Sequence, residues 1–187
     1  MKKLLILGGF GFVGKNLIEK LGSNYEITVI DKAIDKKFVK KNSKKIVNFF
    51  EYKFGRINEK QNLDSLIAQE EPNFIINLIS IVNTARNLSL FPDLIETNFN
   101  TLLELYRATK TLNCLDLVIQ FGSCEEYGNI VQPLKENQRE FPNSPYALIK
   151  QLTTNTSLML HQNYSFPICV VRPSNIFGKY QNKKKFI

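Results

Sequence analysis

Short apolar and β-branched runs alternate along the chain with longer segments whose apolar residues recur at helical spacing. The short runs predict six strands, at residues 3–7, 26–30, 45–49, 74–79, 117–121 and 168–171. The longer segments predict helices at 11–22, 63–69, 94–109 and 145–162, with a lysine-rich loop before the third strand. Such alternation is typical of parallel strands joined by crossover helices. The pattern therefore predicts one α/β domain over residues 1–187, a doubly wound parallel sheet of strand order 3-2-1-4-5-6.

Composition and charge narrow the classes of protein. The 187 residues are 43% hydrophobic and carry a net charge of +8, enough apolar content for one sizeable core. The charge would suit an anionic partner, but lysine clusters also occur on solvated loops, so we expect no nucleic-acid partner. The apolar run at 4–7 is interrupted by glycines, and no stretch approaches the roughly 20 residues of a membrane span, so we expect no membrane partner.

The cysteines and the histidine exclude further classes. Cys114, Cys124 and Cys169 are widely spaced and form neither a CxxC pair nor a disulfide framework, which suits a reducing cytoplasm. His161 is the single histidine of the sequence, whereas zinc enzymes and histidine metal clusters need more than one. We therefore expect a cytoplasmic protein without a metal site.

A glycine-rich segment follows the first predicted strand directly, with the sequence GGFGFVG at 8–14. Gly8 permits a tight turn, Gly11 lets the backbone approach a pyrophosphate, and Gly14 lets the following helix pack close to the strand. The helix N-terminus would supply N–H donors and a positive dipole to the phosphates. In this strand-to-helix context the glycines predict a dinucleotide site on a Rossmann sheet.

Asp31 ends the second predicted strand, about 20 residues beyond the glycines. A carboxylate at this place binds the ribose hydroxyls of adenosine and repels a 2′-phosphate, which favours NAD over NADP. Lys32, Lys36 and Lys37 could offset that repulsion, so NADP stays open as the less favoured cofactor.

Tyr146 and Lys150 lie four residues apart in the predicted last helix and thus on one face of it. An ammonium beside a phenol favours the tyrosinate, so we expect a lowered pKa at Tyr146, suited to proton transfer. This spacing also recurs by chance in helices. Ser123 strengthens the catalytic interpretation, because it follows the fifth strand, at the sheet edge where such folds bind ligands.

Together these residues resemble the extended short-chain dehydrogenase/reductase family, in its branch of NAD-dependent nucleotide-sugar epimerases, dehydratases and reductases. The resemblance runs through the whole chain. Beyond the glycine turn it rests on five segments, which follow with the family pattern that each resembles in parentheses. They are NLIS at 77–80 (often HLAA), residues 98–104 (NxxGTxNLLE), GSCEEYG at 122–128 (SSxxVYG), SPYALIK at 144–150 and RPSNIFG at 172–178 (RxxNVYG).

The resemblance implies a role for each site residue. Tyr146 would be the acid/base at the sugar hydroxyl, Lys150 would bind the nicotinamide ribose and the tyrosinate, and Ser123 would bind the reacting oxygen. Hydride would pass between that sugar carbon and the nicotinamide. Asn175 would approach the diphosphate of a nucleotide-diphosphate sugar. Further cofactor contacts are implied for Phe12, Val13, Lys32, Ile57, Leu78, Ile79, Asn98 and Pro173, and a homodimer is implied for the full-length form.

Departures from the family pattern bear on the reaction. Residues 55–57 read Gly-Arg-Ile instead of Gly-Asp-Ile, which puts an adenine contact in doubt, and Asn100 replaces a glycine. Glu125 matches the acid of the dehydratases and is a possible accessory acid, but Cys124 stands where dehydratases usually carry Asp. The run EEYG at 125–128 also resembles 4-keto-sugar reductases. We therefore favour C4 epimerisation or 4-keto reduction over 4,6-dehydration.

The end of the sequence leaves two kinds of function open. After the sixth predicted strand no further helix or strand is predicted to cover the ligand edge, so we expect the substrate-binding segment to be truncated after about residue 178. The chain is then either the NAD-dependent enzyme or a dinucleotide-binding fragment or regulatory module without turnover. A third function, nucleic-acid binding, would require salt-sensitive affinity for polyanions.

Overall fold

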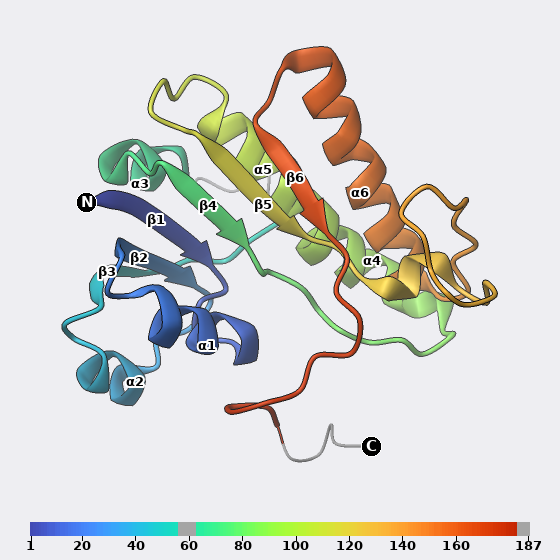
Figure 1. Cartoon of the computed structure of the whole chain (residues 1–187), viewed down its shortest axis with the longest axis horizontal. Helices are drawn as coiled ribbons and strands as arrows, with labels where there is room; N and C mark the ends of the chain where they lie inside the picture. The colour runs from blue at the N-terminus through green and yellow to red at the C-terminus, as the bar shows by residue number, and fades with distance from the viewer. Residues whose placement is uncertain (56–62, 183–187) are drawn as a thin grey trace.

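Six strands form the central sheet in the computed structural model, which describes residues 1–55 and 63–182 (Figure 1). They are β1 (Lys2–Leu7), β2 (Tyr25–Asp31), β3 (Ile46–Glu51), β4 (Phe74–Asn77), β5 (Leu117–Phe121) and β6 (Ile168–Val171). All neighbouring strands are parallel, in the order β3-β2-β1-β4-β5-β6, which confirms the predicted doubly wound sheet. Ile57, an expected cofactor contact, lies outside the described residues.

Helices connect these strands on both faces of the sheet (Figure 1). They are α1 (Phe12–Leu21), α2 (Lys36–Lys41), α3 (Leu63–Glu70), α4 (Phe91–Leu94), α5 (Asn100–Thr109) and α6 (Pro145–Tyr164). The described residues also form the 3-10 turns η1 (Leu88–Leu90) and η3 (Cys124–Tyr127) and the π-helical turn η2 (Ile95–Phe99).

Two apolar clusters hold the helices to the sheet. On one face, Ile18 of α1 and Phe38 of α2 pack against β1, β2 and β3. On the other face, Leu63 of α3, Leu105 of α5 and Leu160 of α6 pack against β1, β4, β5 and β6. Successive residues of β1 belong to the two clusters alternately, as expected for a strand buried on both faces.

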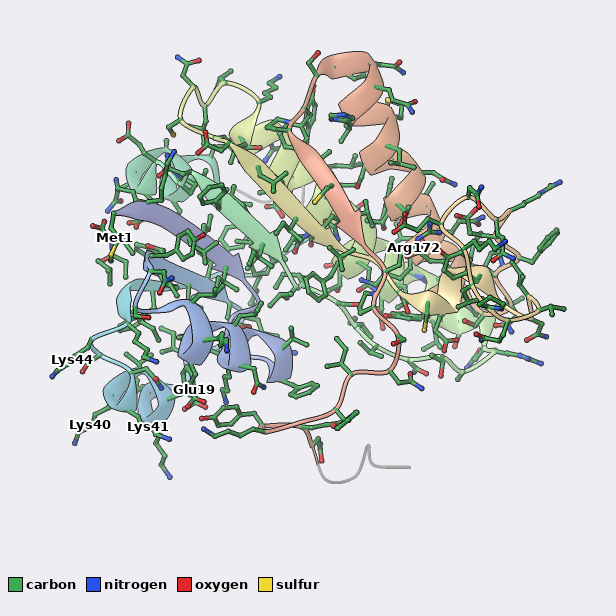
Figure 2. The ribbon with its side chains drawn as sticks, in the orientation of Figure 1. Met1, Glu19, Lys40, Lys41, Lys44 and Arg172 are labelled. Atoms are coloured by element: carbon green, nitrogen blue, oxygen red, sulfur yellow. The ribbon has the colours of Figure 1, made fainter. Side chains whose placement is uncertain are left out.

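The loop expected between β2 and β3 contains a helix, so that prediction was wrong. Asp35 caps α2 by accepting a hydrogen bond from the backbone N–H of Phe38 at 3.0 Å. Phe38 is buried against the core, which anchors a helix of only six residues. Its lysines stay outside: Lys40 and Lys41 are exposed, and Lys41 lies 3.8 Å from the Glu19 carboxylate of α1 (Figure 2).

Two predicted boundaries near the site also needed correction. β4 ends at Asn77 and not at Ile79, because the Asn77 side chain accepts the backbone N–H of Ile79 at 3.1 Å and turns the chain out of the sheet. The long helix expected at 94–109 is interrupted by the π-helical turn η2, in which Asn98 is buried. Such turns occur often at functional sites.

On the α1 face, the helices of the described residues leave β5 and β6 uncovered (Figure 1). Cys169 and Val171 of β6 are exposed. The segment after β6 crosses back to α1, where the backbone carbonyl of Lys179 accepts from the Asn16 side chain at 2.7 Å. Within residues 1–55 and 63–182, none of the helices combines the length and apolar character of a membrane span.

Candidate active site

The turn between β1 and α1 contains several glycines, and the physical reason why a side chain would not fit differs from one glycine to the next. Gly8 has φ of +76°, a left-handed conformation that favours glycine. A Cβ on Gly14 would lie 2.5 Å from both the Cα and the carbonyl oxygen of Gly9. The close approach that Gly14 permits is therefore to this turn, whereas we expected packing against the strand. A Cβ on Gly9 would in turn lie 2.7 Å from Val29, a constraint that sequence reasoning missed.

The N-terminus of α1 presents backbone N–H groups that can donate hydrogen bonds to a ligand. Its N-cap residue, Gly11, has no side chain that could accept from the first helical N–H groups. The first turn contains Phe12, Val13 and Gly14, and such N-terminal amides lack intrahelical partners. These amides and the helix dipole suit a phosphate.

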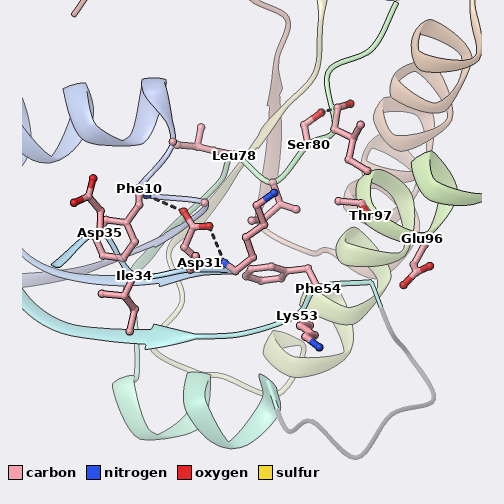
Figure 3. A pocket seen from close by; sticks show the side chains of 16 residues that line it. Phe10, Asp31, Ile34, Asp35, Lys53, Phe54, Leu78, Ser80, Glu96 and Thr97 are labelled. Atoms are coloured by element: carbon pink, nitrogen blue, oxygen red, sulfur yellow. Dashed lines mark hydrogen bonds between the residues drawn. The ribbon is translucent and has the colours of Figure 1, made fainter. Parts of the chain in front are cut away.

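A cavity of about 600 Å³ lies beside this turn, at the carboxyl ends of β1, β2 and β4 (Figure 3). Of the expected cofactor residues, six line it: Gly8, Gly11, Asp31, Lys32, Leu78 and Ile79. The cavity extends from Asp31 and Asp35, past Phe54, to Ser80. The volume and the mixed lining are typical of a small-molecule site.

Asp31 fixes the glycine turn from the end of β2. Its two carboxylate oxygens accept the backbone N–H of Phe10 at 2.9 Å and of Lys32 at 2.7 Å (Figure 3). Burial raises the pKa of Asp31, and the N–H groups of Phe10 and Lys32 oppose that shift. An ionised carboxylate has more acceptor sites than these two bonds use, so Asp31 can also accept hydrogen bonds from the hydroxyl groups of a ligand in the cavity.

The lysines that could favour NADP are placed differently from one another. Lys32 lines the cavity, whereas Lys36 and Lys37 are exposed on α2 and do not line it. Lys15 pairs with Asp35 at 2.7 Å beside the cavity. Of the three lysines that the sequence singled out, Lys32 alone lines the cavity, and Lys53, which was not singled out, lines it as well.

Asn98 holds the chain segment that follows β4. Its side-chain amide accepts the backbone N–H of Ile81 at 2.7 Å and donates to the Ile81 carbonyl at 3.0 Å. Asn98 itself is buried and is not among the cavity-lining residues. It acts on the cavity through Ile81 and the preceding Ser80, both of which line the cavity.

The structure brings Tyr146, Lys150 and Ser123 together. The side chains of Ser123 and Ser80 both interact with the Tyr146 hydroxyl. The Lys150 Nζ atom lies 5.9 Å from the centre of the Tyr146 ring, on the same face of α6. Ser80 was not selected from the sequence as a site residue, although it is the last residue of NLIS at 77–80, the segment that stands where the family often has HLAA.

The expected lowering of the Tyr146 pKa is contradicted. Burial raises the pKa of this phenol above its usual value, and the nearby side chains of Ser123 and Ser80 only oppose the shift. Glu125 and Glu126 raise it further. Desolvation thus dominates over the ammonium that the sequence places nearby.

Lys150 is almost completely buried, with 2% of its surface exposed. Its Nζ atom donates to the backbone carbonyl of Phe121, at the end of β5, at 2.8 Å. Burial lowers the pKa of Lys150 to about 8, while the nearby Glu126 opposes the shift. The ammonium therefore titrates near the working range of a proton-transfer site.

Ser123 is held in place by the turn η3, which it begins. Its hydroxyl accepts the backbone N–H of Glu125 at 3.2 Å, and its own N–H donates to the Glu126 carboxylate at 2.7 Å. Ser123 and Glu126 form a capping box, in which each side chain accepts from the backbone N–H of the other residue. Glu125, the possible accessory acid, lies within this turn and is half-buried.

The remaining expected residues lie after β6. The Pro173 carbonyl accepts the backbone N–H of Cys124 at 3.1 Å and so supports η3, and Pro173 does not line the cavity. Asn175 is exposed. Its contact with a diphosphate stays a prediction. Arg172 binds Glu140 at 2.6 Å and the carbonyl of Glu136 at 2.9 Å, a supporting role (Figure 2).

The sheet order and the glycine turn define a Rossmann-type α/β protein. A model of the NAD dependent epimerase/dehydratase family matches residues 4–187. The chain belongs to this family, as its resemblance to the extended short-chain dehydrogenases/reductases predicted.

Curated relatives align with the whole of this chain at low sequence identity. It is 26% identical over 205 residues to the dTDP-glucose 4,6-dehydratase of Haemophilus influenzae, covering 100% of this chain and 60% of that protein. It is 25% identical over 192 residues to the human dTDP-D-glucose 4,6-dehydratase, covering 100% of this chain and 54% of that protein. The chain thus spans a little over half the length of these relatives.

Solved structures show the same fold. The UDP-glucose 4-epimerase of Thermotoga maritima superposes with a TM-score of 0.82 at 22% identity, over 96% of this chain and 58% of that one. The UDP-glucuronic acid 4-epimerase of Bacillus cereus, solved with NAD, superposes with a TM-score of 0.81 at 21% identity, over 97% of this chain and 60% of that one.

Proposed function

We propose that this chain is the NAD-binding and catalytic part of an enzyme that transfers hydride at C4 of a nucleotide-diphosphate sugar, by epimerisation or 4-keto reduction. The observation that carries the proposal is the convergence of the Ser80 and Ser123 side chains on the Tyr146 hydroxyl, beside a buried Lys150. Ser80 also lines the cavity that begins at the glycine turn. The family's NAD dependence supports the proposal.

The residues around the cavity fit NAD. The uncapped amides of Phe12 and Val13 would hold the pyrophosphate, and Asp31 would accept the adenosine ribose hydroxyls. Ser80 and Lys150 would meet the nicotinamide half. When bound, NAD supplies the hydride acceptor or donor.

Tyr146 holds the proton in this scheme. Because its pKa is raised, the phenol is protonated at neutral pH and can donate to a carbonyl oxygen at C4. Ser123 would position that oxygen by a hydrogen bond. A protonated phenol suits 4-keto reduction directly. In the oxidative direction the phenol must first be deprotonated, so that the phenolate can accept the proton of the C4 hydroxyl.

A 4,6-dehydratase is the second candidate within the family, favoured by the names of the curated relatives. Glu125 is available as an acid, but Cys124 stands in place of the usual Asp. Burial and the charge of Glu125 raise the pKa of the Cys124 thiol, which makes it a poor substitute for a carboxylic acid. Product analysis separates the two reactions, because only dehydration removes water from the sugar.

The test combines cofactor binding with turnover. NAD and NADH binding would be measured by calorimetry, and dTDP-glucose, UDP-glucose and a 4-keto nucleotide sugar would be assayed as substrates by NMR of the products. Tyr146→Phe should lose roughly 10²- to 10⁴-fold in kcat and keep its NAD affinity. Tyr106→Phe, on α5, is the matched control and should stay active.

Two outcomes would count against the enzyme. NAD binding without turnover of any nucleotide sugar, in a protein extended to the length of the curated relatives, would support the dinucleotide-binding module instead. A Tyr146→Phe protein with unchanged kcat would remove Tyr146 from the mechanism.

A further inference from the structure

The carboxyl group of Glu104 is buried in α5 and does not line the candidate cavity. Only 1% of the surface of this residue is exposed. One of its oxygens accepts the Tyr52 hydroxyl, and the other accepts the backbone N–H of Gly55 at 3.1 Å. A buried carboxyl group is costly unless its oxygens find donors, and both donors here come from residues 52–55, the segment that follows β3.

Asn100 binds the same segment from one turn earlier in α5. Its side-chain amide donates to the backbone carbonyl of Gly55 at 3.2 Å. Asn100 and Glu104 are four residues apart and therefore share one face of the helix. Both backbone polar groups of Gly55 are thus bound by α5. Asn100 stands where the family pattern has a glycine, and a glycine could not make this contact.

Gly55 also lies against the backbone of η2. Its φ is +84°, a left-handed conformation that favours glycine, and a Cβ at this position would overlap the backbone carbonyl oxygen of Glu96. The segment 52–55 is therefore fixed on two sides, by hydrogen bonds to α5 and by close backbone contact with η2.

The held segment supplies part of the cavity wall. Lys53 and Phe54 lie between Tyr52 and Gly55 in the sequence, and both line the cavity (Figure 3). The Phe54 ring packs against the Tyr52 ring, with ring centroids 5.1 Å apart. The Tyr52 backbone N–H donates to the Asp31 carbonyl at 2.9 Å, which joins the segment to the end of β2. The wall next to Asp31 therefore depends on how Tyr52 and Gly55 are held.

We propose that Glu104 is a positioning residue for the adenosine half of a bound dinucleotide. It holds the two ends of the segment 52–55 and so fixes the part of the cavity wall next to Asp31, and Asn100 assists it at Gly55. This inference rests on the proposed function for the identity of the ligand and for the place of its adenosine at Asp31. It does not depend on the sugar reaction.

The first test measures the hold on the segment without any ligand. Glu104→Leu keeps the approximate size of the side chain and removes both acceptor oxygens. Hydrogen exchange measured by NMR should then be at least about tenfold faster at the Gly55 amide, relative to the amides of β1, because its acceptor is lost. An unchanged relative exchange rate at Gly55 would overturn the proposal.

Thr109→Val is the matched control for this test. Thr109 is a buried polar residue of the same helix, and its hydroxyl donates to the Leu105 carbonyl at 2.7 Å. The variant removes a buried hydrogen bond from α5 but none to the segment 52–55. It should therefore leave the relative exchange rate of the Gly55 amide unchanged, and an equal effect in Thr109→Val would contradict a specific hold by Glu104.

The second test measures binding by calorimetry with ADP and NAD. ADP contains the adenosine and the diphosphate of NAD and lacks the nicotinamide half. In Glu104→Leu the affinities for ADP and NAD should fall by the same factor, roughly tenfold, because the loss lies in the shared half. Asn100→Ala removes only one bond to Gly55 and should weaken ADP about threefold, which keeps the proposal testable if Glu104→Leu does not fold. Thr109→Val should keep both affinities.

A double variant separates positioning from stability. Tyr52→Phe combined with Glu104→Leu replaces the buried hydroxyl and carboxyl groups by apolar groups of similar shape, so it should regain part of the unfolding temperature lost in Glu104→Leu. The Gly55 N–H still lacks its acceptor, so the ADP affinity should stay weak. Recovery of the ADP affinity together with stability would overturn the proposal, because Glu104 would then act on stability alone.

An unchanged ADP affinity in Glu104→Leu and Asn100→Ala would also overturn the proposal. Failure of the proposed function has a different result. Binding of ADP and NAD by the unmodified chain, without turnover of a nucleotide sugar by the protein extended to the length of its relatives, would remove the hydride transfer and leave this inference standing. Absent binding of both ligands in the unmodified chain would overturn both.

Discussion

The side chain of Asn98 binds both backbone polar groups of Ile81. Its oxygen accepts the Ile81 N–H at 2.7 Å and its nitrogen donates to the Ile81 carbonyl at 3.0 Å. This pair joins the π-helical turn η2 to the segment after β4, 17 residues earlier in the chain. Because Ser80 precedes Ile81, the pair fixes the part of the cavity wall that reaches Tyr146.

Asn98→Ala should therefore be destabilising. It leaves the part-buried backbone N–H of Ile81 without this partner, whereas the Ile81 carbonyl still accepts the Ser80 hydroxyl at 3.3 Å. An unpaired buried group costs about 1–3 kcal/mol, so we expect a loss of that order in the free energy of unfolding, measured by urea denaturation. Asn100→Ala, which removes one part-buried bond of 3.2 Å to the Gly55 carbonyl, should cost less and is the control.

Gly11→Ala and Gly14→Ala should separate ligand binding from folding. A Cβ on Gly14 would meet backbone atoms of Gly9 at 2.5 Å, so Gly14→Ala should lower the free energy of unfolding by about 3 kcal/mol or more. A Cβ on Gly11 meets only the Gly8 carbonyl oxygen, at 3.2 Å, and faces the cavity. Gly11→Ala should leave stability within about 1 kcal/mol and weaken NAD binding at least about tenfold.

Equal stability of Gly11→Ala and Gly14→Ala would contradict the packing argument for the turn. Denaturation curves and calorimetry with NAD on the same preparations provide both measurements.

Asp31→Ala should discriminate between the two dinucleotides. The carboxylate is expected to accept ribose hydroxyls of NAD and to repel the 2′-phosphate of NADP. The variant also loses the bonds to Phe10 and Lys32, so both affinities should fall, but that of NAD by a larger factor. Calorimetry with NAD and NADP measures the ratio, and an equal loss for both would show that Asp31 acts only on the turn.

The stability of the protein should depend on Lys150 at alkaline pH. Its pKa is about 8 in the folded protein and 10.5 as the reference for the unfolded chain. Between these values the unfolded chain binds more protons, so the free energy of unfolding should rise with pH by about 3 kcal/mol in all. Below pH 8 the full cost of the buried ammonium is present.

Lys150→Met isolates this contribution, because Met is apolar, of similar length and does not titrate. The difference in unfolding free energy between the unmodified chain and Lys150→Met should change across pH 8–10.5 in favour of the unmodified chain. A pH-independent difference in urea denaturation would mean that the pKa of Lys150 is not shifted by folding.

Local patterns in the sequence were sufficient for the strands, the sheet order and the glycine turn. Strands buried on both faces are continuous apolar runs, and the strand-glycine-helix order has few alternatives in a parallel sheet. The spacing of Tyr146 and Lys150 likewise required only the period of a helix. Helix α2 was missed because its amphipathic pattern is short and its stability comes from one cap and one buried residue, Phe38.

The tertiary structure alone decided how these parts meet. Ser80 joins Tyr146, and Asn98 joins Ile81, through contacts between segments distant in the sequence, which no local period encodes. Desolvation in the folded chain reversed the direction expected for the Tyr146 pKa, since burial is a property of packing. The sequence by itself determined which chemical groups the site has and on which elements they lie. Packing decided their burial and protonation, because the local dielectric depends on every element that surrounds them.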